Sequence, residues 1–246
     1  MHAATDRLLR HFLEAAQPTV PLVALWAHGS LATDDYQPGR SDLDLIAILD
    51  EPVTMEQWRR IKRMHRGIDL PLADKLHCSY MARQELADLS AEHVTWAHER
   101  IFRRPVTAVT RRELHTRALE LYGPPPAGLL PPVSDEELAE FVRADLRDFW
   151  LVMTRGRRRW LRDIWVDLGT VTVARATVTL RDGRLISKRE ALDVLHELGA
   201  PPNVVADVRA RRYGTPAPVL SRFRRAKLAR AFIRNTITRT LGPASP

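Results

Sequence analysis

The stretch that decides the fold is Leu25–Leu49, LWAHGSLATDDYQPGRSDLDLIAIL. It begins in an apolar run, turns at Gly29 and Ser30, and enters a second apolar run through an Asp-x-Asp pair. Short apolar runs bounded by glycine or proline are typical of buried strands, which we expect over 20–27 and 42–49. The stretch therefore predicts two sheet strands joined by a loop that carries polar side chains.

The Asp-x-Asp pair consists of Asp42 and Asp44, twelve positions after Ser30. Residues two apart in an extended run point to the same face, so both carboxylates leave the sheet together. Two carboxylates this close repel each other unless a cation neutralises them. Mg²⁺ bridged by carboxylates and substrate phosphates is the usual solution. We therefore expect Asp42 and Asp44 to be catalytic and to bind Mg²⁺.

The turn before the pair suits phosphate. Glycine at position 29 lets the backbone approach a ligand closely, and the Ser30 hydroxyl and nearby N–H groups can donate to phosphate oxygens. We expect Gly29, Ser30 and Ser41 to line this site. A substrate hydroxyl could then attack the α-phosphorus of a metal-bound triphosphate while pyrophosphate leaves. Each part alone also has a structural interpretation, as a turn or a solvent-facing acidic pair.

Further elements surround this stretch. Amphipathic helices are expected over 5–17 and 55–66, and a third strand over 75–81. Strands alternating with helices predict an α/β layer with a small mixed sheet, and so an α+β chain.

The pattern after the first hundred residues is wholly helical. The Pro-rich segment 124–132 predicts a linker, which gives an N-terminal domain over 1–123 and an all-helical bundle over 133–246. Capping boxes are expected at Thr110–Glu113, Ser134–Glu137 and Ser187–Glu190. Helices are expected over 135–153, 160–181, 188–198, 203–212 and 219–240.

Composition limits the partners. The chain of 246 residues carries 38 Lys and Arg against 30 Asp and Glu, a net charge of +8 that favours anionic partners such as nucleotides. Aromatic residues do not alternate with the basic clusters at 155–159 and 222–239, so we read these as solvated helix faces and do not expect nucleic acid as a partner.

The single cysteine and the N-terminal segment indicate the compartment. Cys78 cannot form an internal disulfide, and its apolar surroundings predict a buried structural thiol. Neither a signal peptide nor a membrane-spanning segment is apparent, so we expect a cytoplasmic protein without membrane contact.

The segment 25–49 resembles the signature of the polymerase-beta-like nucleotidyltransferase superfamily. The chain as a whole is similar to the aminoglycoside adenylyltransferases that modify streptomycin and spectinomycin, and the resemblance continues through 174–191, ARATVTLRDGRLISKREA. It implies that Arg175 and Lys188, thirteen positions apart, bind the nucleotide phosphates. It also implies that Trp96 contacts the acceptor, with core packing as the alternative.

One position departs from the family pattern. The family's general base is a glutamate on the third strand, and the matching triplet here is Leu76-His77-Cys78. Three interpretations stay open: His77 is the base, Asp74 or Asp69 replaces it, or the protein binds nucleotide without efficient turnover. A neutral imidazole suits base catalysis but is a weak Mg²⁺ ligand.

A polycationic acceptor would need acidic side chains. The candidates are equally explicable as solvated helix residues: Glu99, Asp145, Asp148, Asp163 and Asp167.

The resemblance thus implies a Mg²⁺-dependent enzyme that moves AMP from ATP to a hydroxyl of a small molecule, with an aminoglycoside, and hence antibiotic resistance, as one candidate. Two rivals remain. One is AMP transfer to protein or RNA, which the basic segment 221–240 would favour, and the other is a nucleotide-binding regulatory protein without catalysis. The sequence does not predict an oligomeric state.

Overall fold

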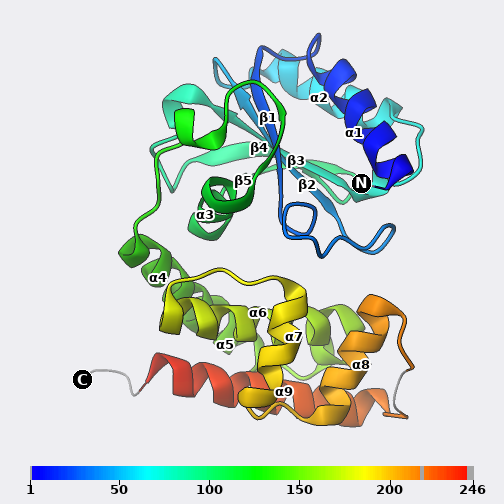
Figure 1. Ribbon diagram of the computed structural model, residues 1–246, viewed down its shortest axis with the longest axis vertical. Helices are drawn as coiled ribbons and strands as arrows, with labels where there is room; N and C mark the ends of the chain where they lie inside the picture. The colour runs from blue at the N-terminus through cyan, green and yellow to red at the C-terminus, as the bar shows by residue number, and fades with distance from the viewer. Residues whose placement is uncertain (1, 217–218, 243–246) are drawn as a thin grey trace. The chain divides into compact units, whose positions relative to one another are not determined.

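The apolar run predicted around Ile46 forms an inner strand of a six-stranded sheet with the order β5-β4-β3-β2-β1-β6. The computed structural model describes residues 2–216 and 219–242 (Figure 1). Neighbouring strands pair antiparallel except β2 and β3, which are parallel and joined through a helix. The strands are β1 (Leu22–His28), β2 (Leu43–Leu49), β3 (Leu76–Ala82), β4 (Glu92–Ala97), β5 (Arg100–Pro105) and β6 (Leu119–Tyr122).

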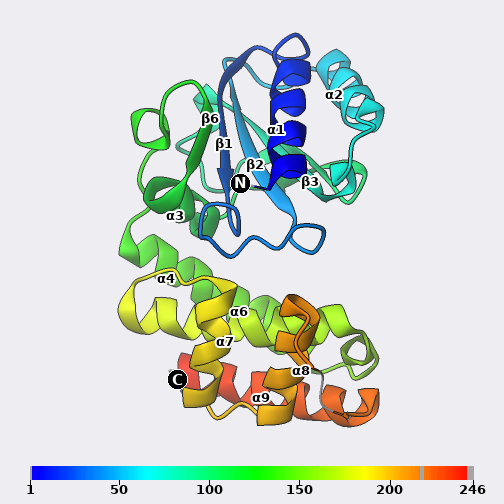
Figure 2. The same cartoon turned by 45° about the vertical axis from the view of Figure 1, so that its right-hand side comes forward.

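Helices cover both faces of this sheet. α1 (Ala3–Ala16) and α2 (Met55–Gly67) lie on one face, where Phe12 and Ile61 join a core of strand residues (Figure 2). α3 (Ala108–Arg117) lies on the other face, where Leu114 packs with Trp26 and Ile46. Both faces of the inner strands are therefore buried, which explains why β2 is apolar throughout except for Asp44 instead of alternating.

The second half of the chain is helical, as the capping boxes at Ser134 and Ser187 predicted. α6 (Asp163–Asp182) packs on α7 (Lys188–Glu197) and α9 (Arg222–Leu241) within this unit. Its core includes Trp160, Val173 and Ile233, which are at most 1% exposed. The helices of this unit are α4 (Asp135–Ala144), the π-helical segment η4 (Asp145–Trp150), α5 (Leu151–Met153), η5 (Arg158–Leu161), α6 (Asp163–Asp182), α7 (Lys188–Glu197), α8 (Pro202–Tyr213) and α9 (Arg222–Leu241).

The two halves form separate compact units that divide between Val133 and Ser134. The segment expected to be a linker packs within the first unit: the indole N–H of Trp26 donates to the carbonyl of Pro124 at 2.9 Å, and Leu130 is 2% exposed. The Pro-rich segment therefore packs against the core of the first unit before the chain enters the second unit.

Two expectations were wrong. The chain beyond residue 100 is not wholly helical, because β5 runs to Pro105 and β6 adds an edge strand next to β1. Helix α3 is capped by Thr107, whose hydroxyl accepts from the N–H of Thr110, so Thr110 lies inside the helix.

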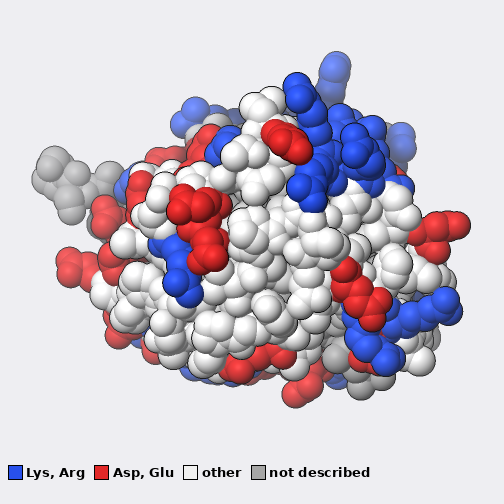
Figure 3. Space-filling view, turned by 90° about the horizontal axis from the view of Figure 1, so that it is seen from above, with Lys and Arg blue, Asp and Glu red and all other residues white. Residues whose placement is uncertain are grey.

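The charge surplus is distributed over the surface of both units. Exposed arginines of α2 account for part of it, and Figure 3 shows Lys and Arg side chains gathered over this helix. Several arginines of the second unit have structural partners instead: Arg230 donates to the carbonyl of Thr154 and Arg239 to that of Leu198. No helix in the described residues is both long and apolar enough to cross a membrane.

Candidate active site

Strand register brings three polar side chains to one level of the sheet. Asp44 of β2 pairs with His28 of β1 on one side and with His77 of β3 on the other. Paired residues in neighbouring strands point to the same face, which here is the face covered by α3. Asp42 lies two positions before Asp44, just ahead of β2, and both carboxylates are half-buried.

Gly29 is in contact with the central carboxylate. Its φ of +65° is left-handed, and a Cβ placed there would lie 3.1 Å from Oδ2 of Asp44. Glycine avoids both the steric cost of this backbone conformation and the crowding. The absence of a side chain therefore leaves open space directly against an oxygen of Asp44.

His77 lies beside the carboxylate and is almost fully buried. Its Nδ1 is 3.4 Å from Oδ1 of Asp44, and its ring meets that of His98 edge-on with centroids 4.5 Å apart. Its Nε2 is buried and has no hydrogen-bond partner among the described residues. The contact with Asp44 orients the imidazole, and a carboxylate partner of this kind favours the tautomer that carries its proton on Nδ1.

A second histidine lies on the other side of Asp44. Nδ1 of His28 is 3.3 Å from Oε2 of Glu113 of α3, and both side chains are mostly buried. Glu113 was expected in a helix cap, and His28 was not predicted as a site residue. The signal was present in the quoted stretch, because His28 immediately precedes Gly29 at the end of a buried strand.

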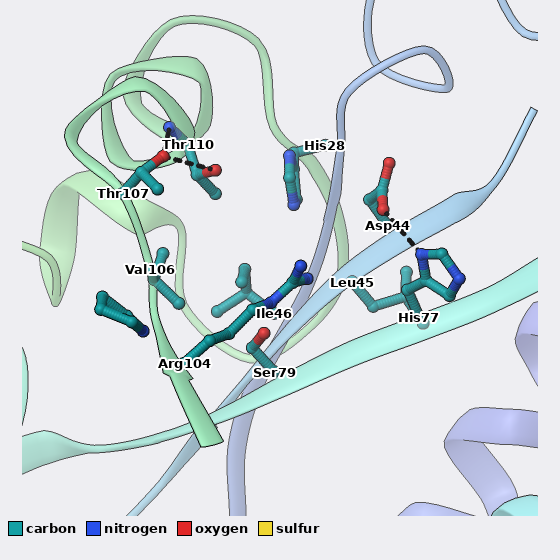
Figure 4. Close-up of a pocket in the computed structure, with 11 residues that line it drawn as sticks. His28, Asp44, Leu45, Ile46, His77, Ser79, Arg104, Val106, Thr107 and Thr110 are labelled. Carbon is teal, nitrogen blue, oxygen red and sulfur yellow. Dashed lines mark hydrogen bonds and ion pairs between the residues drawn. The ribbon is translucent and has the colours of Figure 1, made fainter. Parts of the chain in front are cut away.

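His28, Asp44 and His77 line a cavity of about 250 Å³ within the first unit. Figure 4 shows Asp44 and His77 on one side of the group and Thr107 and Thr110 on another, with the Arg104 side chain extending from β5 into the space between them. Ser79 also lines the cavity, and its hydroxyl is 2.8 Å from that of Thr95 in β4. None of the residues from β5 and α3 was predicted.

The two predicted phosphate-site serines have different environments. Ser30 is half-buried in the turn after Gly29, where its carbonyl accepts from the N–H of Asp35. Ser41 is 3% exposed, and its hydroxyl accepts from the N–H of Gln37 at 3.1 Å. The Ser41 side chain therefore stabilises the loop before β2.

Trp96 lies on the opposite face of the sheet. It is 4% exposed, pairs with Cys78 in the sheet, and stacks on His65 of α2 with ring centroids 4.8 Å apart. Burial, reinforced by the charge of His77, lowers the pKa of His65 to about 3. This geometry corresponds to the core-packing alternative for Trp96 and does not bring it to the cavity beside Asp44.

Cys78 is buried, as expected. It is 1% exposed, and burial raises the pKa of its thiol well above the usual range. A thiol held neutral in the core is a packing group.

The alternative bases on the loop before β3 lie elsewhere. Asp74 has a side chain that is 62% exposed and lies 3.6 Å from Lys75. Asp69 borders a separate surface groove with residues of α1, among them Arg7 and His11. Of the three candidates, only His77 lines the cavity of Asp44.

Arg175 and Lys188 lie in the second unit. Arg175 of α6 donates from Nε to the carbonyl of Ile186 at 2.8 Å, which ties α6 to the segment that leads into α7. Lys188 is the first residue of α7, after the capping residue Ser187. Both side chains are half-buried.

Most of the acidic residues of the second unit that were candidates for binding a cationic acceptor have arginine partners. Asp163 pairs with Arg225, and Asp167 forms hydrogen bonds to Arg211 as short as 2.6 Å. Asp148 pairs with its exposed neighbour Arg147. Burial raises the pKa of Asp145, which lies in the π-helical segment. Glu99, in the first unit, forms the β4–β5 turn with a φ of +59°.

Comparison with known proteins agrees with this architecture. Residues 8–120 match the family model of the nucleotidyltransferase domain. The fold is similar to that of spectinomycin adenyltransferase AAD(9) from Enterococcus faecialis, solved with ATP and spectinomycin, with a TM-score of 0.69 and 14% identity over 95% of this chain and 96% of that one. No curated protein matches the sequence.

Proposed function

We propose that this chain, whose residues 8–120 match the nucleotidyltransferase domain, transfers AMP from ATP to a hydroxyl of a small molecule in a Mg²⁺-dependent reaction. The observation that carries the proposal is the placement of Asp44 between Gly29 and His77, with Asp42 two residues away. The structural relative that was solved with ATP supports the choice of nucleotide.

The donor set fits a magnesium ion that is shared with substrate. Asp42 and Asp44 offer carboxylate oxygens, which Mg²⁺ prefers, and the missing Cβ of Gly29 leaves room against Oδ2 of Asp44. The described residues contain no group of three or more potential metal ligands, so phosphate oxygens would complete the coordination. Mg²⁺ supplies neutralisation of the triphosphate charge when it is bound.

The transfer has a simple atom balance. The acceptor oxygen forms a bond to the α-phosphorus, the bond from that phosphorus to the oxygen bridging to the β-phosphate breaks, and pyrophosphate leaves. The hydroxyl proton passes to the His77 imidazole in this proposal. A neutral imidazole has one ring nitrogen with a free lone pair, and this nitrogen accepts the proton.

Phosphate binding is assigned to the backbone and to cationic side chains. The N–H groups of the turn at Gly29 and Ser30 are proposed to donate to the phosphates. Arg175 and Lys188 remain our proposed clamps, supported by their charge and by the spacing shared with the aminoglycoside adenylyltransferases. The variant Arg175→Gln should then raise the KM for ATP.

Pyrophosphate release from Mg²⁺–ATP tests the proposal. The double variant Asp42→Asn with Asp44→Asn should lose Mg²⁺-dependent turnover with every acceptor that the wild type uses, because neither amide can hold the cation as a carboxylate does. The variant Asp50→Asn, at an exposed carboxylate just beyond β2, is the matched control. Unchanged Mg²⁺–ATP affinity and turnover in the double variant would refute the site.

The same assay separates the three interpretations of the base. If His77 is the base, His77→Ala should bind Mg²⁺–ATP by calorimetry but release pyrophosphate at least 100-fold more slowly, a typical contribution for general-base catalysis. If Asp74→Asn has that effect instead, the base lies on the loop before β3. Tight ATP binding without turnover by the wild type would favour a regulatory protein.

A further inference from the structure

The wall of the cavity that faces Asp44 carries cationic and hydroxyl groups. Arg104 comes from the end of β5, and Thr107 and Thr110 come from the first turn of α3. In Figure 4 the guanidinium of Arg104 extends toward His28 and Asp44. A group bound against this wall would therefore lie next to Asp44, the carboxylate of this cavity that is proposed to bind the metal.

Arg104 is available for a ligand. Its guanidinium lies 5.9 Å from the ring centroid of Phe102, and in the described part of the chain it forms no ion pair. Arginines of the second unit differ, since Arg211 and Arg225 are held by aspartates. An exposed guanidinium without a carboxylate partner can bind a carboxylate or phosphate through two parallel hydrogen bonds.

Thr110 adds a donor. The Thr107 hydroxyl donates to Oγ1 of Thr110 and accepts from its N–H, so Thr110 retains its own hydroxyl hydrogen for a ligand. The first turn of α3 contains no acidic residue, and Arg111 and Arg112 follow. The positive end of the helix dipole therefore adds to the charge of Arg104.

The same cavity offers little to a polycation. Its wall contains one carboxylate, Asp44, which we assign to the metal, and the nearby Glu113 is occupied by His28. Asp163 and Asp167, two of the candidates for binding ammonium groups, are held by arginines in the second unit.

We propose that the acceptor carries an anionic group, a carboxylate or a phosphate monoester, which Arg104 and Thr110 bind while its hydroxyl faces Asp44. This inference rests on the proposed function and specifies its substrate class. It predicts a preference for a sugar phosphate or a hydroxy acid over an aminoglycoside.

Matched pairs of hydroxyl compounds test the preference. Glycerol with glycerol 3-phosphate, and glucose with glucose 6-phosphate and gluconate, differ mainly in charge, and spectinomycin supplies the cationic arm. In the pyrophosphate assay, the anionic member should be the better acceptor. Arg104→Gln should raise its KM about 10- to 100-fold, the usual effect of losing a charged hydrogen-bonding partner, with little change for the neutral member.

Two variants serve as controls. Arg100→Gln removes the same charge from the same strand at a position outside the cavity lining, and should leave every KM unchanged. Thr110→Val should weaken binding of the anionic member by a smaller factor, about threefold to tenfold. The affinity of Arg104→Gln for Mg²⁺–ATP should equal that of the wild type; a loss confined to ATP would assign Arg104 to the nucleotide and overturn the proposal.

Calorimetric binding of the same compounds gives a readout independent of turnover. Binding of anionic members that is lost in Arg104→Gln, without pyrophosphate release, would support this inference while the proposed function fails. Pyrophosphate release with spectinomycin alone, insensitive to Arg104→Gln, would overturn the inference while the proposed function stands. Absence of binding by any anionic member would also overturn it.

Discussion

Replacing Gly29 by alanine should damage turnover far more than stability. The residue has a φ of +65°, a conformation that costs an L-residue with a Cβ about 1 kcal/mol. The new methyl would lie 3.1 Å from Oδ2 of Asp44, tighter than an ordinary contact, so the carboxylate must move by a few tenths of an ångström. A misplacement of about 1 Å can cost roughly 100-fold in rate, so a shift of this size predicts a loss of about tenfold.

Gly39 provides a matched control for the backbone cost. Its φ is +77°, it lies in the same loop before β2, and a Cβ there would meet nothing within 4 Å. Gly39→Ala should therefore carry the same strain of about 1 kcal/mol without touching Asp44. Both variants should melt a few degrees below the wild type, about 2–4 °C for a protein of this size.

Pyrophosphate release and thermal unfolding, measured on both variants, separate the two effects. Gly29→Ala should lose about tenfold in kcat with a stability close to that of Gly39→Ala, which should retain wild-type turnover. Equal loss of turnover in the two variants would show that loop strain, and not crowding of Asp44, controls activity. Full activity of Gly29→Ala would refute the dependence of turnover on the position of the Asp44 carboxylate.

Two further predictions concern the cores of the two units. The pKa of His65 is lowered to about 3, so its imidazole is neutral in the folded protein. In the unfolded chain the same imidazole binds a proton below pH 6.5. The free energy of unfolding therefore has its full value above pH 6.5 and falls as the pH drops toward 3. Urea unfolding should show a loss of about 2 kcal/mol between pH 7 and pH 5 that His65→Gln reduces; a wild-type stability that stays constant over this range would contradict the buried neutral state. Gly169→Ala would place a Cβ 2.9 Å from Trp160 and 2.8 Å from Ile233, and should cost about 1–3 kcal/mol in urea unfolding, whereas Gly156→Ala, whose nearest neighbour is 3.9 Å away, should be near neutral.

The central strands could be predicted because their sequence is unambiguous. β1, β2 and β3 are short apolar runs between turn residues, and all three were placed within two residues of their observed ends. The helices with capping boxes at Ser134 and Ser187 were predicted for the same reason, since a cap fixes where a helix starts.

The edge strands could not be predicted, because most of their residues are exposed and form no apolar run. β5 has the sequence RIFRRP, in which charged residues fall on both faces, and β6 has four residues. With β5 unassigned, the start of α3 was also misplaced by one turn. Thr107 and Thr110 are both acceptable caps, and only the preceding strand, ending at Pro105, decides between them.

Part of the candidate site could therefore not be predicted from the sequence. Asp42, Asp44, Gly29 and His77 belong to the stretches that were read correctly, so their proximity follows from strand order. Arg104 and Thr110 reach the cavity only through β5 and α3, so their contribution depends on elements that single-sequence patterns do not reveal. Trp96 was assigned by resemblance, and the side of the strand it faces depends on pairing with β3.

The arginines of β5 also bear on whether the border of the sheet can pair with strands of other molecules. A strand at the border of a sheet presents unpaired N–H and C=O groups that invite strands of other molecules, and charged residues and proline discourage such pairing. One border of the sheet is β5, which carries Arg100, Arg103 and Arg104 and ends at Pro105. The other border is β6, which has only four residues and is followed by a glycine and prolines after Tyr122. The charge available for ligand binding thus also keeps the sheet from growing, and neutralising all three arginines together should make the protein prone to aggregate even where its fold is unchanged.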